Sequence, residues 1–283
     1  MRVLLVPNPA NPRSVEATGQ LCARLAASGY QPVLAHDDAD ACGLGSFGVS
    51  RAEIGEPGLA LALGGDGTIL KAVHLLDTSD VPILGINLGR LGFLSGADGD
   101  MLPDAVVEAA LAGEAAIECR QTLEASVTVG GRAAGEYRAL NEIFVGRAPT
   151  ARVVELEVSV NGTRVGRYLC DGVVVATPTG STAYALSVGG PLVSPDVRGI
   201  IVVPVAPHTL IARPIVTGPG DVIRIACPNP ARAEACVAVD GDHVPCRAAL
   251  DSVEVRIGDH DIRLMRFDGR DFYEVLTQTF LGG

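Results

Sequence analysis

The fold is decided by residues 59–73, which read LALALGGDGTILKAV. The apolar run Leu59–Leu63 predicts a short buried strand, and the glycines around Asp66 end it. Helical spacing of apolar residues from Thr68 to about Asp77 then predicts a helix. A buried strand that passes through a glycine turn into a helix is typical of a parallel sheet covered by helices.

The segments around this stretch repeat the alternation of strand and helix. Strands are predicted at 3–6, 31–35 and 82–86, and helices at 14–28 and 102–111. Ser14 is expected to cap the first of these helices, and Gly29 to end it. Residues 1–115 are therefore expected to form an α/β domain.

From about Ala116 the pattern changes to short strands without helices between them. Asn161-Gly162 predicts a tight hairpin turn. Further strands are predicted at 172–177, 200–205, 221–226, 253–257 and 262–266. Such a series favours an all-β sandwich over residues 116–265. Residues 271–280 have helical spacing again, so we expect residues 266–283 to return to the first domain.

The composition excludes several classes of protein. The 283 residues carry a net charge of −11, which argues against non-specific nucleic-acid binding. Lys71 is the only lysine and lies outside any Walker-A string, so a P-loop enzyme is excluded. No apolar run is long enough for a membrane span. Seven cysteines without a C-x-x-C spacing indicate reduced thiols and a cytoplasmic protein.

The stretch Gly64–Thr68 has two interpretations. Its glycines let the backbone approach a ligand closely, and N–H groups at the start of a helix favour a phosphate. Asp66 would then accept the proton of an attacking hydroxyl, as kinase aspartates do. A glycine turn with Asp66 as the helix N-cap fits the same spacing equally well.

Three other stretches carry candidate ligand-binding residues. Asn141-Glu142 offers donors and acceptors for a ribose diol, although a surface turn is the commoner reading of such a pair. Residues 171–184 lead from an apolar strand to Tyr184, whose ring would either stack on a base or lie in the core. Arg90 would hold a phosphate or be solvated.

Taken together, these motifs resemble those of the NAD kinase family. The resemblance rests on residues 64–68, 85–94, 141–142, 171–184, 189–191, 207–216 and 239–241, which stand in the family's order. The GGDG string alone is weak, because diacylglycerol and sphingosine kinases and phosphofructokinases resemble it. The string TPTGSTAY at 177–184, followed by GGP, is highly specific.

This resemblance implies a fold and an activity. The fold is a Rossmann-like N-terminal domain and a β-sandwich C-terminal domain with the site between them, in a homodimer or homotetramer whose neighbouring subunits complete the site. The activity is transfer of the ATP γ-phosphoryl group to the 2′-hydroxyl of the adenosine ribose of NAD, giving NADP. Polyphosphate is an alternative donor. Mg²⁺ or another divalent metal is expected to bind with ATP, held mainly by substrate phosphates rather than by protein ligands.

The resemblance also implies roles for individual residues, with Asp66 as the general base. Phosphate or ATP contacts are implied for Gly65, Thr68, Arg90 and Asp240, and a phosphate contact on the NAD side for Gly67. Ribose contacts are implied for Asn141 and Glu142, and contacts at the adenine end for Thr182, Ala183, Tyr184 and Ser187. Asp171 would contact the nicotinamide amide, and Phe93 would pack on the dinucleotide.

Two departures from the family pattern are visible. Relatives often end in a basic tail, whereas this chain reads Thr277-Gln278-Thr279-Phe280, and they often carry an arginine before the Asp-Gly at 171–172, where this chain has Cys170. Two rival functions also remain at this point. One is a GGDG-type kinase with a lipid or sugar acceptor, and the other is a non-catalytic dinucleotide-binding module.

Overall fold

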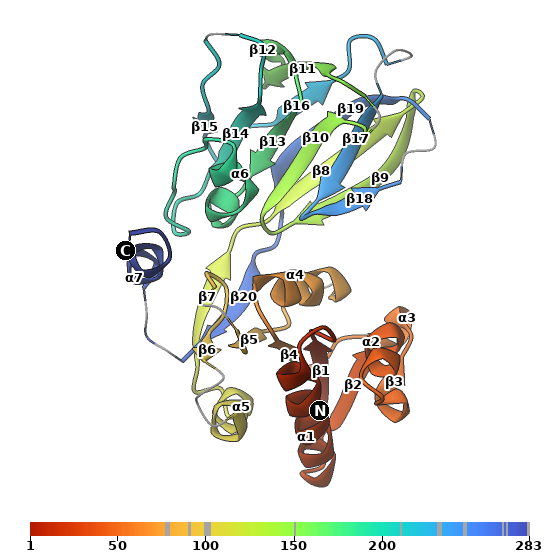
Figure 1. Ribbon diagram of the computed structural model, residues 1–283, viewed down its shortest axis with the longest axis vertical. Coiled ribbons are helices and arrows are strands. Elements are labelled where there is room, and N and C mark those ends of the chain that lie inside the picture. The colour runs from red at the N-terminus through yellow and green to blue at the C-terminus, as the bar shows by residue number, and fades with distance from the viewer. Residues whose placement is uncertain are drawn as a thin grey trace. The chain divides into compact units, whose positions relative to one another are not determined.

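The computed structural model describes residues 1–76, 80–89, 92–98, 103–149, 151–209, 211–230, 234–245, 248–267, 269 and 271–281. The chain divides into two compact units. Unit 1 comprises Met1–Cys119 and Ile262–Gly283, and unit 2 comprises Arg120–Asp261. Figure 1 shows the helices and strands of both units.

Unit 1 contains an eight-stranded sheet in the order β3-β2-β1-β4-β5-β20-β7, with β6 paired to β5. Its strands are β1 (Arg2–Pro7), β2 (Gln31–Ala35), β3 (Gly48–Val49), β4 (Leu59–Leu63), β5 (Ile83–Asn87), β6 (Ala97–Asp98), β7 (Ala116–Arg120) and β20 (Ile262–Arg266). The pairs β1–β2, β1–β4, β4–β5 and β5–β20 are all parallel. The order 3-2-1-4-5 is that of a Rossmann-like sheet, as the resemblance implied.

The helices of unit 1 accompany this sheet. They are α1 (Pro12–Ala27), α2 (His36–Ala41), α3 (Arg51–Ile54), α4 (Asp66–Leu75), α5 (Pro103–Leu111) and α7 (Phe272–Leu276), with a 3₁₀ turn, η1 (Gly45–Phe47), and a π-helical turn, η3 (Thr277–Leu281). The core combines apolar residues of β1, β4 and β5 with residues of α1 and α5, including Leu5, Leu61, Ile86, Leu21 and Val107.

The predicted N-cap of α1 is wrong by one turn. Asn11 caps the helix by accepting a hydrogen bond from the N–H of Arg13 at 3.1 Å. Ser14 is fully buried inside α1 and donates its hydroxyl to the carbonyl of Leu63 at 2.6 Å. Ser14 therefore ties α1 to the end of β4. The predicted stop at Gly29 is confirmed, because its φ of +81° suits glycine.

Unit 2 consists of two six-stranded sheets. One has the order β15-β14-β13-β10-β17-β18 and the other β12-β11-β16-β19-β8-β9. The strands are β8 (Leu123–Val129), β9 (Arg132–Ala139), β10 (Glu142–Arg147), β11 (Val154–Val160), β12 (Thr163–Cys170), β13 (Gly172–Ala176), β14 (Ile200–Val205), β15 (Ile215–Thr217), β16 (Ile223–Ala226), β17 (Ala235–Val239), β18 (Asp242–Val244) and β19 (Leu250–Ile257), and η2 (Thr179–Thr182) and α6 (Tyr184–Ser187) follow β13.

A single apolar core joins these two sheets. It contains Ile143 and Val173 from the first sheet and Leu156 and Val253 from the second, all at most 2% exposed. The predicted hairpin turn is confirmed, since Asn161 and Gly162 have positive φ values of 51° and 79° between β11 and β12. Two antiparallel sheets that share one core form the predicted sandwich.

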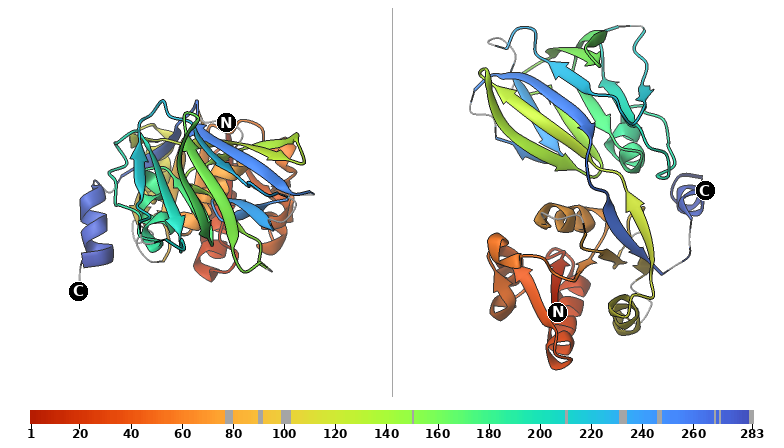
Figure 2. Two further views of the ribbon diagram at one scale, coloured as in Figure 1. Left: turned by 90° about the horizontal axis from the view of Figure 1, so that it is seen from above. Right: turned by 180° about the vertical axis from the view of Figure 1, so that it is seen from behind.

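Two strands at the ends of the range predicted for the sandwich, 116–265, belong to the other unit. Residues 262–266 form β20, which pairs in parallel with β5, and β7 lies next to β20 in the same sheet. Figure 2 shows the two strands side by side, so the chain enters and leaves unit 2 through adjacent strands. The apolar pattern of β20 suits either environment, and only its partners assign it.

The C-terminal segment returns to unit 1, as predicted. The side chain of Asp271 caps α7 by accepting from the N–H of Glu274 at 2.8 Å. The ring of Phe280 stacks on Phe93 with centroids 5.8 Å apart, and Phe272 lies 6.0 Å from the same ring. Within the described residues, no helix has the length and apolar character that a membrane crossing requires.

Candidate active site

The Gly64–Thr68 stretch lies at the carboxyl end of β4, beside β1. The chain runs outward from β1 to β2 and β3 and then returns to the other side of β1 as β4. This reversal is the switch point at which open parallel sheets bind ligands. Gly65 is the N-cap of α4 and Asp66 is its first residue, so the alternative reading of Asp66 as the N-cap is wrong.

The three glycines of this stretch lie in different surroundings. A Cβ at Gly64 would lie 2.2 Å from the hydroxyl of Thr68, so packing inside the protein excludes a larger residue there. A Cβ at Gly65 or Gly67 would meet nothing within 4 Å, and neither residue has a positive φ. The fold itself therefore leaves open space at these two positions, beside the first N–H groups of α4.

The carboxylate of Asp66 is held by the backbone that follows β5. It accepts hydrogen bonds from the N–H of Phe93 at 2.9 Å and of Leu94 at 3.1 Å. Gly92 makes this approach possible, because a Cβ there would lie 2.2 Å from Oδ1 of Asp66. An ionised carboxylate has about four acceptor sites, so these two bonds leave acceptor capacity for a further donor.

The only lysine is engaged by an acidic partner. Lys71 forms an ion pair with Asp38 of α2, whose side chain is 3% exposed. A lysine already paired with a buried carboxylate is a poor candidate for gripping a phosphate.

In unit 2, Asp240 organises the turn before β10. Its carboxylate accepts hydrogen bonds from the N–H groups of Leu140 at 2.8 Å, Asn141 at 2.7 Å and Glu142 at 3.0 Å. Asp240 itself has a φ of +47° and donates its N–H to the carbonyl of Glu142 at 2.9 Å. This network fixes the Asn141-Glu142 pair in one geometry.

Glu142 is a buried carboxyl group with unused hydrogen-bonding capacity. It is 8% exposed, and its Oε2 is buried without a partner. Its pKa is raised to about 7, mainly by burial and then by the charge of Asp240, while a hydrogen bond from the backbone of Tyr184 acts in the opposite direction. A buried, unsatisfied carboxylate oxygen is costly, and a ligand hydroxyl would satisfy it.

The loop after β13 packs directly on this pair. A Cβ at Gly180 would lie 2.1 Å from the carbonyl of Asn141, and Thr177 donates its N–H to that carbonyl at 2.9 Å. The hydroxyls of Thr177 and Ser181 are buried and bond to backbone, so they hold the loop.

Tyr184 does not lie in the core, one of the two alternatives left by the sequence. Tyr184 is 40% exposed, and its ring packs edge-on with that of Phe144, with the two ring centroids 5.8 Å apart. One part of the ring is therefore available for stacking on a base. Thr182, Ala183 and Ser187 lie on the same short η2–α6 segment and are partly or fully exposed.

One predicted residue lies apart from these groups, and another lies outside the described part of the chain. Asp171 stands before β13, at the far end from Glu142, because Gly172 pairs with Gly146 and Ala176 with Glu142. Those four residue steps correspond to about 13 Å of strand. The carboxylate of Asp171 forms an ion pair with Arg147 at 2.9 Å. Arg90 lies outside the residues that the structure describes.

Gly92 and Arg266 support the Asp66 region without having been singled out from the sequence. Gly92 lies within residues 85–94, one of the stretches that carry the family resemblance. Nothing in the sequence except its being a glycine indicated a close approach of another group. Arg266 is 8% exposed and bonds to the carbonyls of Phe93 and Ser95. An arginine at the end of an apolar strand pattern is a weak hint of such burial.

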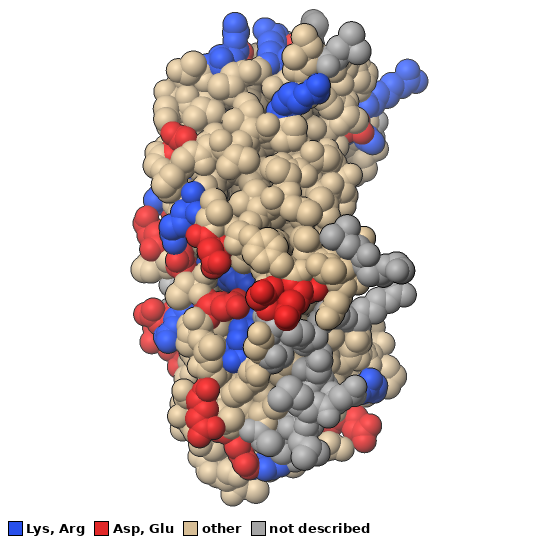
Figure 3. Space-filling model, turned by 90° about the vertical axis from the view of Figure 1, so that its left-hand side faces the viewer, with Lys and Arg blue, Asp and Glu red and all other residues tan. Residues whose placement is uncertain are grey.

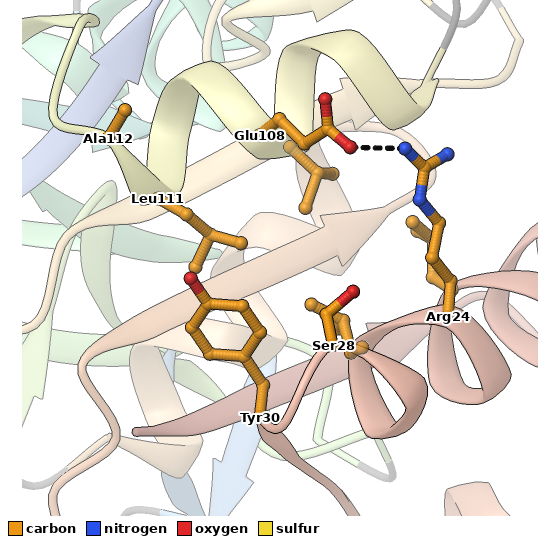
Figure 4. Close-up of a pocket in the computed structure, with 9 residues that line it drawn as sticks. Arg24, Ser28, Tyr30, Glu108, Leu111 and Ala112 are labelled. Atoms are coloured by element: carbon orange, nitrogen blue, oxygen red, sulfur yellow. Dashed lines mark hydrogen bonds and ion pairs between the residues drawn. The ribbon is translucent and has the colours of Figure 1, made fainter.

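A separate cavity of about 380 Å³ lies between α1 and α5 and contains none of the predicted site residues. Figure 4 shows Tyr30 and Leu111 at one end and the ion pair of Arg24 with Glu108 at the other. Across the described part of the chain, no three His, Cys, Asp or Glu side chains are grouped closely enough to hold a metal ion.

The fold and these residues define a class of protein. An aspartate-bearing glycine loop at the switch point of a Rossmann-like sheet, in a chain that also carries a β-sandwich, is typical of two-domain kinases with a Gly-Gly-Asp-Gly motif.

Comparison with known proteins identifies the family within that class. The family model described as the ATP-NAD kinase N-terminal domain matches residues 51–113, and the one described as the C-terminal domain matches residues 140–267. The NAD kinase of Symbiobacterium thermophilum is 43% identical over 98% of both chains. That of Mycobacterium tuberculosis is 40% identical over 78% of this chain and 72% of its own. The chain belongs to the ATP-NAD kinase family.

Solved structures of two relatives share the fold. A yeast NADH kinase complexed with NADH has a TM-score of 0.88 at 26% identity, covering 100% of this chain and 87% of its own. An NAD kinase from Archaeoglobus fulgidus in complex with ATP has a TM-score of 0.73 at 25% identity, covering 98% and 99%.

Proposed function

We propose that this protein transfers the γ-phosphoryl group of ATP to the 2′-hydroxyl of the adenosine ribose of NAD and so produces NADP. The family supports this activity, and the yeast and Archaeoglobus relatives were solved with NADH and with ATP. The observation that carries the proposal is the Asp66 carboxylate, which stands at the switch point of the sheet with acceptor capacity left.

In this mechanism Asp66 is the general base. Its carboxylate accepts the proton of the ribose 2′-hydroxyl as the bond to the γ-phosphorus forms, and the two N–H donors keep it oriented. The protein's other contribution is alignment of the hydroxyl with the phosphorus, since phosphoryl transfer needs little further covalent chemistry.

The start of α4 is the proposed phosphate site. The open space at Gly65 and Gly67 admits phosphate oxygens close to the backbone. The N–H of Thr68 is already donated to the carbonyl of Gly65 at 2.9 Å, so Thr68 would contribute its hydroxyl. Arg90 completes the proposed phosphate contacts.

The residues of unit 2 are proposed to bind NAD. The unsatisfied oxygen of Glu142 accepts a ribose hydroxyl, and Asn141 binds the same diol. Tyr184 stacks on the adenine, with Thr182, Ala183 and Ser187 at that end of the pocket. Asp171 contacts the nicotinamide amide, and Phe93 of unit 1 packs on the dinucleotide.

Asp240 changes role in this proposal. Its carboxylate accepts three backbone N–H groups, which leaves it little capacity for a nucleotide. We therefore expect Asp240 to act by holding Asn141 and Glu142 rather than by contacting ATP.

Mg²⁺ is proposed to enter with ATP. Asp66 is assigned to the proton, so the metal is expected to be held mainly by the phosphates of the substrate, which are common ligands of Mg²⁺. When bound, the metal neutralises charge on the triphosphate. The absence of a free lysine beside the glycine loop makes this neutralisation more important, so EDTA should abolish turnover.

Replacing Asp66 by asparagine tests the proposal. Loss of a general base typically costs about 10²–10⁴-fold in rate, so Asp66→Asn should lose at least about 10²-fold in kcat while still binding NAD. NADP formation in a coupled assay measures kcat, and calorimetry measures NAD binding. Asp37→Asn, an exposed aspartate also in the first turn of a helix, is the control. A near-wild-type rate for Asp66→Asn would overturn the assignment.

The same assay separates the substrates. ATP and polyphosphate are offered as donors in parallel, and NAD, diacylglycerol and a sugar phosphate as acceptors. Phosphorylation of a lipid or sugar in preference to NAD would favour another GGDG-type kinase. NAD binding without turnover would favour a dinucleotide-binding module.

A homodimer or homotetramer is also proposed. Among the exposed large apolar side chains of unit 2, Val216 lies on the edge strand β15, Ile211 precedes that strand in the chain, and Leu192 and Val197 precede its neighbour β14. Figure 3 shows the corresponding face, the left-hand side of Figure 1, with an extended area that has few charged side chains. Exposed apolar patches of this kind favour association.

The proposed location is the cytoplasm. Cys22, Cys170 and Cys227 are buried and unpaired, and burial raises the pKa of each thiol to about 11. Such thiols are unreactive, which fits a reducing compartment.

A further inference from the structure

Arg266 is a buried cation at the end of β20. It is 8% exposed, and all three of its nitrogen positions are engaged. Nη1 donates to the carbonyl of Ser95 at 2.5 Å and Nη2 to the carbonyl of Phe93 at 2.9 Å. Nε pairs with the carboxylate of Glu118, on β7, at 3.1 Å.

The peptide that Arg266 binds is the one that binds Asp66. The carbonyl of Phe93 and the N–H of Leu94 belong to one planar, trans peptide unit, so they point in opposite directions. The carbonyl end accepts from Arg266 at 2.9 Å, and the N–H end donates to Asp66 at 3.1 Å. A rotation of this peptide that weakened one bond would therefore weaken the other.

The rest of the loop is packed against β20 as well. Gly96 accepts a hydrogen bond from the N–H of Phe267 at 2.8 Å, and a Cβ at Gly96 would lie 1.8 Å from the carbonyl of Met265. On the opposite side, Gly92 leaves room for the Asp66 carboxylate. Residues 92–96 are thus held between β20 and the start of α4.

We infer that Arg266 is a positioning residue for Asp66, acting through the Phe93–Leu94 peptide. This inference rests on the proposed function, because it concerns the carboxylate assigned there as the general base. The guanidinium suits the task because its planar fork serves two carbonyls and a carboxylate at once, whereas a lysine ammonium is a single point charge.

A Lys substitution isolates this role. Arg266→Lys keeps the charge beside Glu118 but cannot hold both carbonyls in the fork geometry. Misplacement of a catalytic group by about 1 Å can cost on the order of 100-fold in rate. We expect kcat to fall by about 10- to 100-fold, and the KM for NAD to change by less than about 3-fold, since the loop geometry affects the reacting carboxylate.

Arg2→Lys is the matched control. Arg2 is also in unit 1 and also donates to two neighbouring carbonyls, those of Glu53 at 2.6 Å and Ile54 at 2.9 Å. These hydrogen bonds are made to residues 53 and 54 and not to residues 92–96. Its kcat should stay within about 2-fold of the wild type, as for most surface substitutions.

A double-mutant cycle distinguishes positioning from general stabilisation. If Arg266 acts through Asp66, then Arg266→Lys in an Asp66→Asn background should lower kcat by less than about 2-fold, because residues that act as a unit are non-additive. An equal loss in both backgrounds, an unchanged kcat in the single variant, or a rise in KM as large as the fall in kcat would each overturn the inference.

Glu118→Gln provides a second variant should Arg266→Lys fold poorly. It leaves Arg266 in place but weakens its anchor, so it should show a smaller loss of kcat with the same dependence on Asp66. A loss that persists fully in the Asp66→Asn background would overturn the inference. Asp66→Asn alone decides the base assignment separately, so a failure of that assignment and a failure of the Arg266 inference give different results.

Discussion

At the scale of single residues, the glycines near Asp66 separate structural from functional requirements. Gly64 and Gly92 lie against protein atoms, whereas Gly65 and Gly67 face open space. The sequence presents all four simply as glycines. Their different roles depend on contacts between segments distant in the chain, which spacing alone does not reveal.

Gly92→Ala should impair catalysis by displacing the carboxylate. The new Cβ would lie 2.2 Å from Oδ1 of Asp66, so one of the two groups must move. We expect kcat to fall by about 10- to 100-fold, as expected for a shift of about 1 Å in a reacting group. Gly89→Ala, where the Cβ meets nothing within 4 Å, should retain nearly full kcat. Equal kcat values for the two variants would contradict this prediction.

Glu142 should make the stability of the unliganded protein depend on pH. Its folded pKa is about 7, raised by burial and by Asp240, against about 4.3 in an unfolded chain. The unfolded state therefore binds fewer protons between these values, and the free energy of unfolding falls as the pH rises from about 4 to 7. Most of that loss is reached once the pH exceeds 7.

Glu142→Gln should remove this pH dependence. Glutamine is always neutral, so at pH 8 the variant should be more stable than the wild type by at most about 4 kcal/mol, and equally stable near pH 4. Its KM for NAD should nevertheless rise by about 10-fold or more, because a hydrogen bond to a charged group is lost. Urea unfolding at the two pH values and NAD-dependent kinetics measure these effects. A variant less stable than the wild type at pH 8 would refute the argument.

At the scale of elements, local sequence patterns predicted where most strands and helices lie, but they did not predict which strands pair with one another. The buried runs 31–35 and 59–63 form strands with the predicted bounds. The assignments of 116–119 and 262–265 to the sandwich were wrong, because the sequence of a short strand does not specify the sheet in which it pairs. Helix α2, made largely of polar residues over His36–Ala41, gave no apolar periodicity from which to predict it.

The C-terminal segment is attached through aromatic contacts that can be tested. Phe280 stacks on Phe93 with an angle of 24° between the rings. Such pairs contribute about 0.5–1.5 kcal/mol beyond buried area, so Phe280→Ala should lower the free energy of unfolding by about 1 kcal/mol. Gln278→Ala, an exposed position on the same turn, should have little effect. Chemical denaturation measures both, and indistinguishable values would show that the stacking is energetically unimportant.

At the scale of the whole molecule, the change from alternating strands and helices to strands alone predicted the two units, and the order of the motifs predicted the family. The residues that hold the candidate site in place were not predicted. The sequence named Asp66, Asn141, Glu142 and Tyr184 as site residues. It did not show that Asp240 holds the Asn141-Glu142 turn or that Arg266 holds the peptide bound to Asp66, because both interactions join residues about 100 or more positions apart.

The edge strand β15 provides a test of assembly. Val216 is 51% exposed at the centre of β15. A charge introduced there would be buried without a partner in an oligomer, which is strongly unfavourable. Val216→Asp should therefore shift the mass measured by light scattering toward that of the 29.1 kDa monomer. Ile117→Asp, at an apolar position 39% exposed in unit 1, should leave the mass unchanged.

The place of β20 in the sheet also determines when the enzyme can become active during its synthesis. On the ribosome, residues 120–261 emerge before β20 and can fold as soon as their own core is complete. The strand that lies between β5 and β7, and the arginine that orders the Asp66 loop, are translated only afterwards. A nascent chain that stalls before Ile262 therefore holds a finished sandwich beside an unfinished parallel sheet.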